Sequence, residues 1–176
     1  SHSPPADSGY RVYLGAGSQI VSPIDTEISE CIAGFDPLTI DLADADDPLI
    51  DRLDGTWVDR YVEFAPSVRL RPDVAGVAVA YTAMHGVGGA VVLRAFEAAG
   101  FDPPFVVAEQ QEPDGTFPTV SFPNPEEPGA MDLLLETARS VGAFVALAND
   151  PDADRLGAAI PQADGSWRRL SGDEIG

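Results

Sequence analysis

From residue 74 onward, the chain alternates between short, continuously apolar runs and segments whose apolar residues recur every three or four positions. Three runs have the pattern of strands that are buried on both faces: residues 74–82, 104–108 and 143–148. The segments between them each carry one apolar stripe at helical spacing: Val92, Phe96 and Ala99, followed by Gly100 as a helix stop, and then Met131, Leu134, Leu135, Ala138 and Val141. Strands that alternate with helices predict βαβ units, and therefore an α/β fold with a largely parallel sheet.

The two ends of the chain add further elements. Residues 156–161 and 166–170 have the pattern of two strands joined by a tight turn, and the final S-G-D-E-I-G has the pattern of a first helical turn. Nearer the N-terminus, helical spacing predicts two more helices: a short amphipathic one carrying Ile24, Ile28, Cys31 and Ile32, and one over residues 48–64 carrying Trp57, Tyr61 and Phe64.

Charge and composition restrict the possible partners. Acidic residues outnumber basic ones 29 to 10, and the resulting formal net charge of −19 argues against nucleic acid or an anionic membrane as a partner. No apolar run approaches the length of a membrane-spanning helix. The one cysteine, Cys31, allows no internal disulfide and is expected to be a small core residue, which fits a reducing compartment such as the cytoplasm.

Three aspartates follow directly after the third apolar run, in the motif D-P-D-A-D-R at residues 150–155. Neighbouring carboxylates raise each other's pKa unless a positive charge lies among them, and carboxylate oxygens select hard cations such as Mg²⁺ or Ca²⁺. The carboxyl end of a parallel strand is where α/β folds bind ligands. The spacing does not fit an EF-hand, which needs Gly and Glu where Arg155 and Pro161 stand. An acidic surface turn is the alternative, and it is our interpretation of Asp44, Asp46 and Asp47.

Two further loops contain the histidines. H-G-V-G-G, residues 85–89, lies at a strand-to-helix junction, where glycines let the backbone approach an anion. A tight turn with close helix–sheet packing explains the same residues, and the spacing fits neither a dinucleotide fingerprint nor a P-loop. At the start, S-H-S-P-P-A-D-S-G-Y-R brings Ser1, His2 and Arg11 together, either as a nucleophile with flanking polar groups or as a plain loop.

Taken in order, these stretches resemble the α-D-phosphohexomutase superfamily of phosphoglucomutases and phosphomannomutases. S-H-S-P-P-A-D-S-G-Y-R-V-Y is similar to the family's active-serine loop, and Y-T-A-M-H-G-V-G-G to the opening of its second domain. P-N-P-E at residues 123–126 and D-P-D-A-D-R are similar to two further family motifs. The resemblance implies a three-layer α/β/α fold with a mainly parallel, mixed sheet, plus a remnant of a preceding similar domain. Residues 1–60 would be the end of domain I and a connector, and residues 61–176 would be domain II.

The resemblance also implies roles for individual residues. Ser1 would be phosphorylated and would share Mg²⁺ with the carboxylates of Asp150, Asp152 and Asp154. Substrate or phosphate would be bound by Arg155, His85 and Gly86, while His2 and Arg11 would be catalytic residues flanking the serine. Arg11 stands where the family usually has Lys, and Ser3 where it usually has Asn. Because an arginine stays protonated, residue 11 would keep the positive charge of the lysine but could not transfer a proton.

The implied activity is that of an isomerase, an intramolecular phosphotransferase. It would interconvert hexose 1-phosphate and hexose 6-phosphate through a phosphoserine enzyme and a hexose bisphosphate, with Mg²⁺ as cofactor. Sugar-recognition and distal phosphate loops would belong to missing C-terminal domains, so the isolated chain is expected to be nearly inactive. Two alternatives stay open: a metal-dependent phosphatase with Asp150 as nucleophile, and a stand-alone domain that binds a cation or phosphate.

Overall fold

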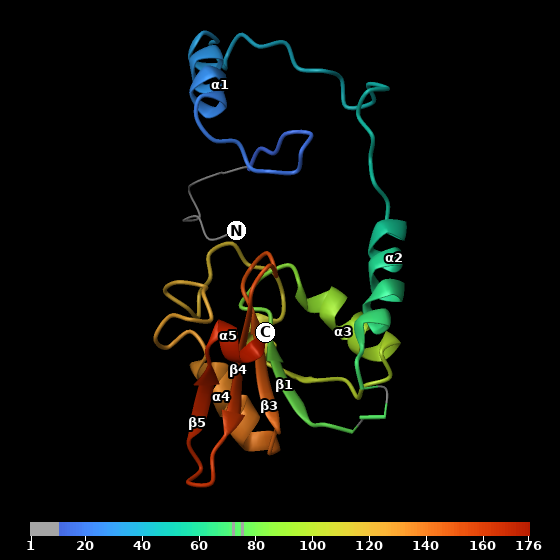
Figure 1. Cartoon of the computed structure of the whole chain (residues 1–176), viewed down its shortest axis with the longest axis vertical. Coiled ribbons are helices and arrows are strands. Elements are labelled where there is room, and N and C mark those ends of the chain that lie inside the picture. The colour runs from blue at the N-terminus through green and yellow to red at the C-terminus, as the bar shows by residue number, and fades with distance from the viewer. Residues whose placement is uncertain (1–10, 72, 75) are drawn as a thin grey trace. The chain divides into compact units, whose positions relative to one another are not determined.

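The computed structural model describes residues 11–71, 73–74 and 76–176 (Figure 1). These residues form two compact units, one ending at Leu53 and the other running from Asp54 to Gly176. The first unit contains helix α1 (Ile24–Ala33) and an isolated antiparallel bridge between Tyr13 and Gln19. The predicted helix is therefore confirmed. The expectation of a buried Cys31 is wrong: the thiol is exposed, because α1 buries none of its residues.

The second unit is built around a five-stranded mixed sheet, which confirms the predicted α/β fold. Its strands are β1 (Val79–Thr82), β2 (Phe105–Val106), β3 (Val145–Asn149), β4 (Leu156–Pro161) and β5 (Trp167–Leu170). Their order is β2-β1-β3-β4-β5. The first three strands are mutually parallel, whereas β4 and β5 are antiparallel additions. The hairpin formed by β4 and β5 confirms the two strands that the sequence predicted at the C-terminal end.

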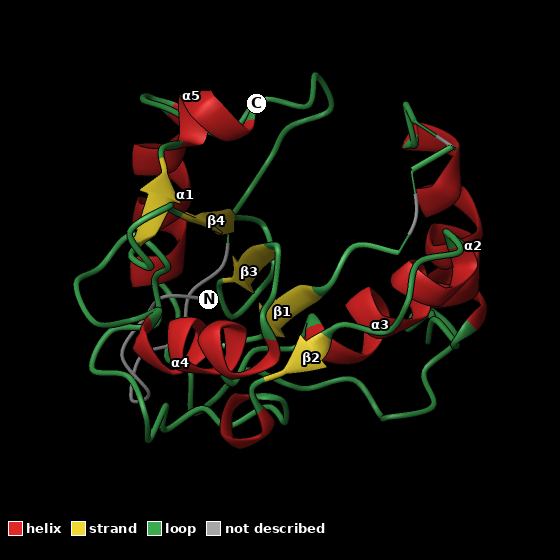
Figure 2. Cartoon of the chain, turned by 90° about the horizontal axis from the view of Figure 1, so that it is seen from below, coloured by secondary structure: helices red, strands yellow, loops and turns green. Residues whose placement is uncertain are grey.

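Helices cover both faces of this sheet. The helices of this unit are α2 (Thr56–Phe64), α3 (Gly89–Ala98), α4 (Asp132–Val141) and the short α5 (Gly172–Ile175), with 3₁₀ turns at Ala65–Val68 and Ala108–Gln110. Helix α2 packs against α3. In β1 and β3, Ala80 and Ala146 face α4, whereas Val79 and Leu147 line an apolar pocket of about 420 Å³ together with residues of α3. Since successive side chains of a strand point to opposite faces, α3 and α4 lie on opposite sides of the sheet (Figure 2).

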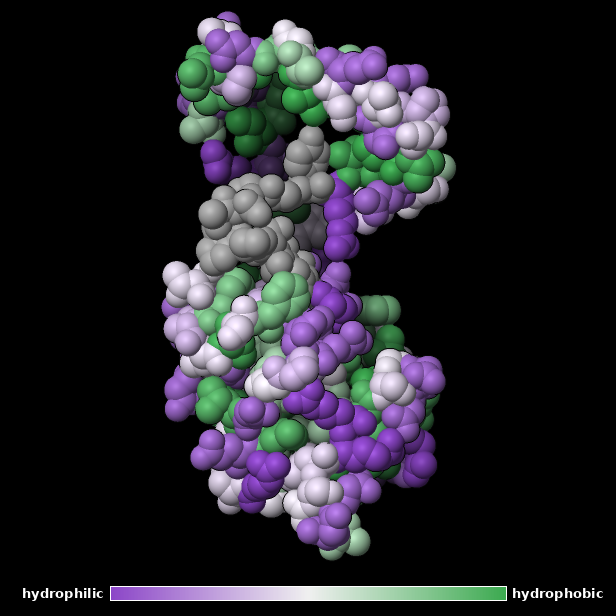
Figure 3. Space-filling view, turned by 90° about the vertical axis from the view of Figure 1, so that its left-hand side faces the viewer, coloured by the Kyte–Doolittle hydropathy of each residue, from purple (hydrophilic) through white to green (hydrophobic). Residues whose placement is uncertain are grey.

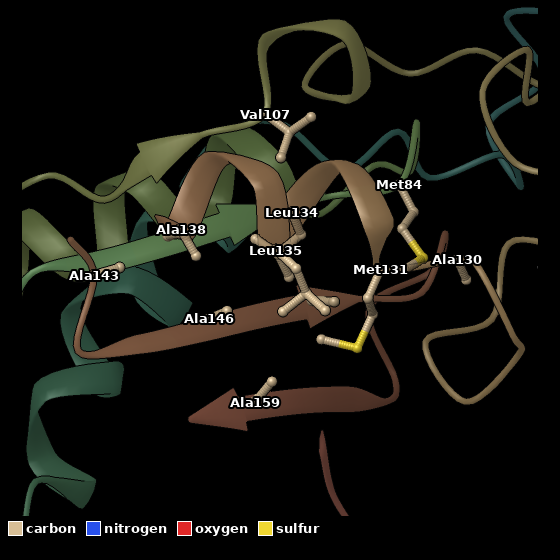
Figure 4. Close-up of a cluster of buried hydrophobic side chains, with 12 residues drawn as sticks. Met84, Val107, Ala130, Met131, Leu134, Leu135, Ala138, Ala143, Ala146 and Ala159 are labelled. Atoms are coloured by element: carbon tan, nitrogen blue, oxygen red, sulfur yellow. The ribbon is translucent and has the colours of Figure 1, made fainter. Parts of the chain in front are cut away.

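The core of the second unit lies between α4 and the sheet. Figure 4 shows Leu134 and Leu135 of α4, and Met131 just before it, pointing toward the strands that carry Ala146 and Ala159. Small alanines on the strands let the helix approach closely, and its leucines fill the space between them. Leu134 is completely buried, which stabilises the fold by about 1.5–3 kcal/mol for that side chain. This packing holds the carboxyl ends of β1 and β3 in fixed positions.

Three predicted elements are shorter than expected, and one of them is the strand predicted over residues 104–108, of which only Phe105–Val106 form β2. The helix predicted over residues 48–64 begins only at Thr56, whose backbone N–H and hydroxyl both donate to the Asp54 carboxylate. This local bond sets the helix start. The strand predicted over residues 74–82 begins at Val79, because Gly76 has a left-handed backbone with φ +71° that interrupts an extended run.

Hydrophilic side chains cover most of the face shown in Figure 3, with hydrophobic residues in scattered patches. Such a surface is what the large excess of acidic residues leads one to expect. Among residues 11–71, 73–74 and 76–176, no helix has the length and apolar character that a membrane crossing requires.

Candidate functional site

Two loops meet at the carboxyl edge of the sheet. Strand β1 ends at Thr82 and leads into the H-G-V-G-G turn, whereas β3 ends at Asn149 and leads into D-P-D-A-D-R. The two strands are parallel neighbours, with Thr82 paired to Ala148. Their carboxyl ends therefore lie side by side, in the position where α/β folds bind ligands.

The three aspartates of the second loop converge. Asp150, Asp152 and Asp154 each offer one carboxylate oxygen, and these oxygens all lie within 4.8 Å of one another. Asp150 is completely buried, whereas the other two carboxylates are exposed. One fixed ligand and two adjustable ones, all oxygen, form a donor set suited to a hard cation.

Backbone and side-chain hydrogen bonds hold Asp150 in place. Arg155 binds its carboxylate twice: the backbone N–H donates to Oδ1 at 3.0 Å and Nε donates to Oδ2 at 3.3 Å. The loop reverses at Ala153, whose N–H donates to the Asp150 carbonyl at 2.9 Å and whose φ is +59°. A left-handed conformation at a non-glycine residue costs about 1–3 kcal/mol and persists only where its surroundings enforce it.

A second hydrogen-bonded chain closes the base of this loop. The Tyr81 hydroxyl donates to Asn149 Oδ1 at 3.1 Å, and Asn149 Nδ2 donates to the Arg155 carbonyl at 2.8 Å. Burial raises the pKa of the Tyr81 phenol, so the hydroxyl stays protonated and available as a donor. The loop is thus tied to both β1 and β3.

The electrostatics of the cluster favour a cation. Burial raises the pKa of the Asp150 carboxyl, and the carboxylates of Asp152 and Asp154 raise it further, against the lowering effect of the Arg155 backbone N–H. The Arg155 guanidinium also lies 3.8 Å from Asp154. Three ionised carboxylates and one guanidinium leave two negative charges, which a divalent cation would neutralise.

The glycines of the H-G-V-G-G turn allow contact between the two loops. A Cβ on Gly86 would lie 2.4 Å from Pro151 Cα, and one on Gly88 would lie 2.8 Å from Ala153 Cβ. The Val87 N–H donates to the Pro151 carbonyl at 2.8 Å, and the Gly86 N–H donates to the Ala83 carbonyl at 2.7 Å. These contacts are those of the tight-packing interpretation, and the predicted phosphate-binding role of Gly86 stays a prediction.

His85 is also held by the protein itself. It is buried, its φ is +59°, and its Nε2 lies 2.8 Å from Thr119 Oγ1. Its backbone N–H donates to the Gln110 carbonyl, and its carbonyl accepts from the Asp114 N–H. The substrate-binding role predicted for His85 therefore stays a prediction.

Three predicted site residues come from the N-terminal end of the chain. Ser1 and His2 lie outside the described residues. Arg11 is exposed and belongs to the unit that ends at Leu53, so its catalytic role stays a prediction. The third motif, P-N-P-E, packs against β4: Pro125 would contact a Cβ on Gly157 at 2.5 Å.

Several supporting residues had no signal in the sequence. Tyr81 and Thr82 were part of an apolar run, and Gln110 and Thr119 lie in turn-rich segments with no motif. Only Asn149 stood directly before the aspartate motif and could have been noticed. Their hydrogen bonds join positions far apart in the chain, so no local pattern reports them.

Comparisons with known proteins agree with this fold. Residues 57–165 match the family model for phosphoglucomutase/phosphomannomutase, alpha/beta/alpha domain II. The chain is 46% identical over 180 residues to a probable phosphomannomutase of Haemophilus influenzae, covering 100% of this chain and 36% of that protein. It is 40% identical over 191 residues to human phosphopentomutase, covering 100% of this chain and 30% of that protein. The chain thus spans about a third of the length of these curated relatives.

A solved structure of a protein from the same family also matches this fold. The crystal structure of a phosphoglucomutase/phosphomannomutase family protein from Burkholderia thailandensis matches with a TM-score of 0.53 and 26% identity. The match covers 66% of this chain and 23% of that one.

Proposed function

Because the chain belongs to the phosphoglucomutase/phosphomannomutase family, we propose that it forms the metal-binding part of a phosphosugar mutase. Relatives named phosphomannomutase, phosphopentomutase and glucose 1,6-bisphosphate synthase support a phosphorylated sugar as the substrate. The proposed reaction interconverts a sugar 1-phosphate with its isomer phosphorylated at the terminal hydroxyl, which is C6 in a hexose.

The observation that carries this proposal is the convergence of the three aspartates. Their oxygens lie within 4.8 Å of one another. Opposite oxygens in a Mg²⁺ octahedron are about 4.2 Å apart, given bonds of about 2.1 Å. A small rotation of the exposed Asp152 and Asp154 side chains brings the set to that size, and Mg²⁺ is therefore the proposed cation. Asp150 is the fixed member because both of its oxygens are held by Arg155.

The proposed chemistry transfers one phosphoryl group in each direction. The phosphate on Ser1 passes to the free hydroxyl of the sugar monophosphate: the bond from phosphorus to Ser1 Oγ breaks, a bond to the sugar oxygen forms, and the hydroxyl proton ends on Ser1. The sugar bisphosphate then turns over and returns its other phosphoryl group to Ser1. Bound Mg²⁺ would neutralise charge on the serine phosphate.

The chain's own residues would position these groups. Asp150, Asp152 and Asp154 would hold the cation, and the half-exposed Arg155 guanidinium would face the transferred phosphate while it orients Asp150. Arginine suits a phosphate because its planar group donates two parallel hydrogen bonds. Arg11 would add positive charge near Ser1 without transferring a proton.

The phosphatase alternative finds less support. A nucleophilic carboxylate must reach a phosphorus atom, but Asp150 is completely buried and both of its oxygens accept hydrogen bonds from Arg155. A stand-alone binding domain would use the same three aspartates. It would differ from a mutase only in lacking turnover, so activity measurements distinguish the two.

The test uses the full-length protein that contains these 176 residues. Mass spectrometry should find phosphate on Ser1, and the protein should isomerise at least one of glucose 1-phosphate, mannose 1-phosphate and ribose 1-phosphate. Ser1→Ala and Asp150→Asn should each abolish turnover. We expect the 176-residue chain alone to be nearly inactive.

Each other outcome selects an alternative. Phosphate release that survives Ser1→Ala but not Asp150→Asn would favour the phosphatase. Cation binding without any turnover of the three sugars by the full-length protein would favour the binding domain.

A further inference from the structure

Two neighbouring residues behind the aspartate loop adopt left-handed backbone conformations. Met84 has φ +48° and His85 has φ +59°, and neither is a glycine. Such conformations are retained only where the surrounding structure holds them, and they cluster at functional sites. Both side chains are buried, and together the two residues form the turn that leads to Gly86 and Val87.

A chain of buried and partly buried hydrogen bonds holds this turn. The Met84 N–H donates to Thr82 Oγ1 at 3.0 Å, and the Thr82 hydroxyl donates to Gln110 Oε1 at 2.6 Å. Gln110 Nε2 donates to Thr119 Oγ1 at 2.8 Å, and the same hydroxyl shares a 2.8 Å hydrogen bond with His85 Nε2. Gln110 is almost completely buried, and hydrogen bonds in such a chain polarise and strengthen one another.

The segment after β2 binds three polar groups of His85: its backbone N–H, its backbone carbonyl and its ring Nε2. Its backbone N–H donates to the Gln110 carbonyl at 2.9 Å, and its carbonyl accepts from the Asp114 N–H at 3.0 Å. The ring is fixed by Thr119. The conformation of the turn thus depends on residues that lie 25 or more positions further along the chain.

This left-handed turn also supports the aspartate loop. Val87 donates its N–H to the Pro151 carbonyl, and Gly86 lies so close to Pro151 that no Cβ would fit. Pro151 lies between Asp150 and Asp152 in the chain. A displacement of the turn would therefore move the backbone that carries two of the three carboxylates.

We propose that Thr119 and Gln110 are positioning residues for the metal site. They hold His85 and the left-handed turn, and the turn fixes the aspartate loop through Gly86 and Val87. Neither residue contacts the carboxylates. Their effect resembles that of residues behind metal ligands, whose loss weakens metal binding by about 10–100-fold. This inference deepens the proposed metal site, but its first test does not depend on metal binding.

Thr119 offers a clean variant because its side chain is exposed. Thr119→Val keeps the shape and removes the hydroxyl that both Gln110 and His85 bind, whereas Thr119→Ser keeps the hydroxyl. Thr116→Val is the matched control: it lies in the same segment, and its hydroxyl binds only the Asp114 carboxylate among the described partners.

The first measurement is amide hydrogen exchange in the metal-free chain. Three amides report on the loops: Val87, Ala153 and Arg155. Thr119→Val should speed their exchange about tenfold, because the two partly buried hydrogen bonds to the Thr119 hydroxyl are lost. The Gln162 amide, which donates to Ser166 in the β4–β5 turn, should not change. Thr119→Ser should restore the wild-type rates, and Thr116→Val should leave them unchanged.

The second measurement is Mg²⁺ affinity by titration calorimetry, which Thr119→Val should lower about tenfold and Thr119→Ser should restore. Unchanged exchange at the three reporter amides would overturn the inference. Equal acceleration of exchange at the Gln162 amide would also overturn it, because it means a general loss of stability. An unchanged Mg²⁺ affinity despite faster exchange would overturn it as well. If the wild-type chain binds no Mg²⁺ but the exchange pattern holds, the positioning of the loop stands and the proposed metal function fails.

Discussion

The chain carries two clusters of three aspartates, and they differ in almost everything except composition. Asp44, Asp46 and Asp47 lie in the unit that ends at Leu53, in a turn closed by a hydrogen bond from the Asp47 N–H to the Asp44 carbonyl. The Asp47 carboxylate accepts from the Leu49 N–H at 2.8 Å. This is the solvated turn that we expected there, with the Asp47 carboxylate used for local backbone structure.

The second cluster begins where a buried strand ends. Asp150 follows β3 directly and is completely buried, and its oxygens are bound by a residue five positions later. Among the described residues, this is the one group whose carboxylate oxygens converge closely enough to share a metal ion. A run of aspartates therefore becomes a candidate cation site when packing fixes at least one carboxylate.

The largest expected difference between the clusters is in cation affinity. Asp150→Asn should lower Mg²⁺ affinity about 100-fold or more, since loss of a ligand exceeds the effect of losing its support. The Asn amide oxygen can still accept the Arg155 backbone N–H, which keeps the backbone of the loop in place, while the hydrogen bond from Arg155 Nε is lost. Asp46→Asn, the matched change in the other cluster, should leave the affinity unchanged. Titration calorimetry measures the Mg²⁺ affinity of both variants. Equal losses of affinity would contradict the difference between the two clusters.

A smaller effect should follow from separating the two loops. Gly86→Ala forces a Cβ against the Pro151 backbone and should destabilise the second unit by about 1–3 kcal/mol. Urea unfolding followed by tryptophan fluorescence reports this, because Trp57 and Trp167 both lie in that unit. Gly115→Ala is the control: no atom lies within 4 Å of its Cβ, so the change should stay within about 0.5 kcal/mol. Equal stabilities of the two variants would contradict the contact.

The smallest expected effect is a dependence on pH. The pKa of Asp150 is raised above 3.8 in the folded chain, so its contribution to stability is present below that pH and is lost as pH rises through the folded pKa. Mg²⁺ needs the ionised carboxylate and should offset this loss. The increase in Tm caused by Mg²⁺ should thus be absent near pH 3.8 and grow by a few degrees toward about pH 7. A Tm increase that is independent of pH, or that persists in Asp150→Asn, would count against the site.

Much of the fold could be predicted from the sequence because its signals are local. The apolar runs and helical stripes predicted α3, α4, β3 and the C-terminal hairpin, each of which depends on a pattern within a few residues. The helix over residues 48–64 was too long because its apolar spacing covered only the part from Trp57 onward. Cys31 was misplaced because an amphipathic pattern shows which face could be buried, not whether anything covers it.

The site could be predicted in part. The aspartate motif and its position after a strand were visible, but the contact between Gly86 and Pro151 joins segments that only the parallel pairing of β1 and β3 brings together. The link from Gln110 through Thr119 to His85 depends on hydrogen bonds over 9 and 34 positions. Such bonds leave no periodic pattern, so the supports of the site became evident only in three dimensions.

The most direct test of the central claim is the position of a bound ion. Crystals of the chain soaked in Mn²⁺, which shares the oxygen ligands of Mg²⁺, should show an anomalous diffraction peak with Asp150, Asp152 and Asp154 oxygens at about 2.2 Å. A peak at Asp44 to Asp47 instead, or none at the end of β3 with the ion in excess, would contradict the account.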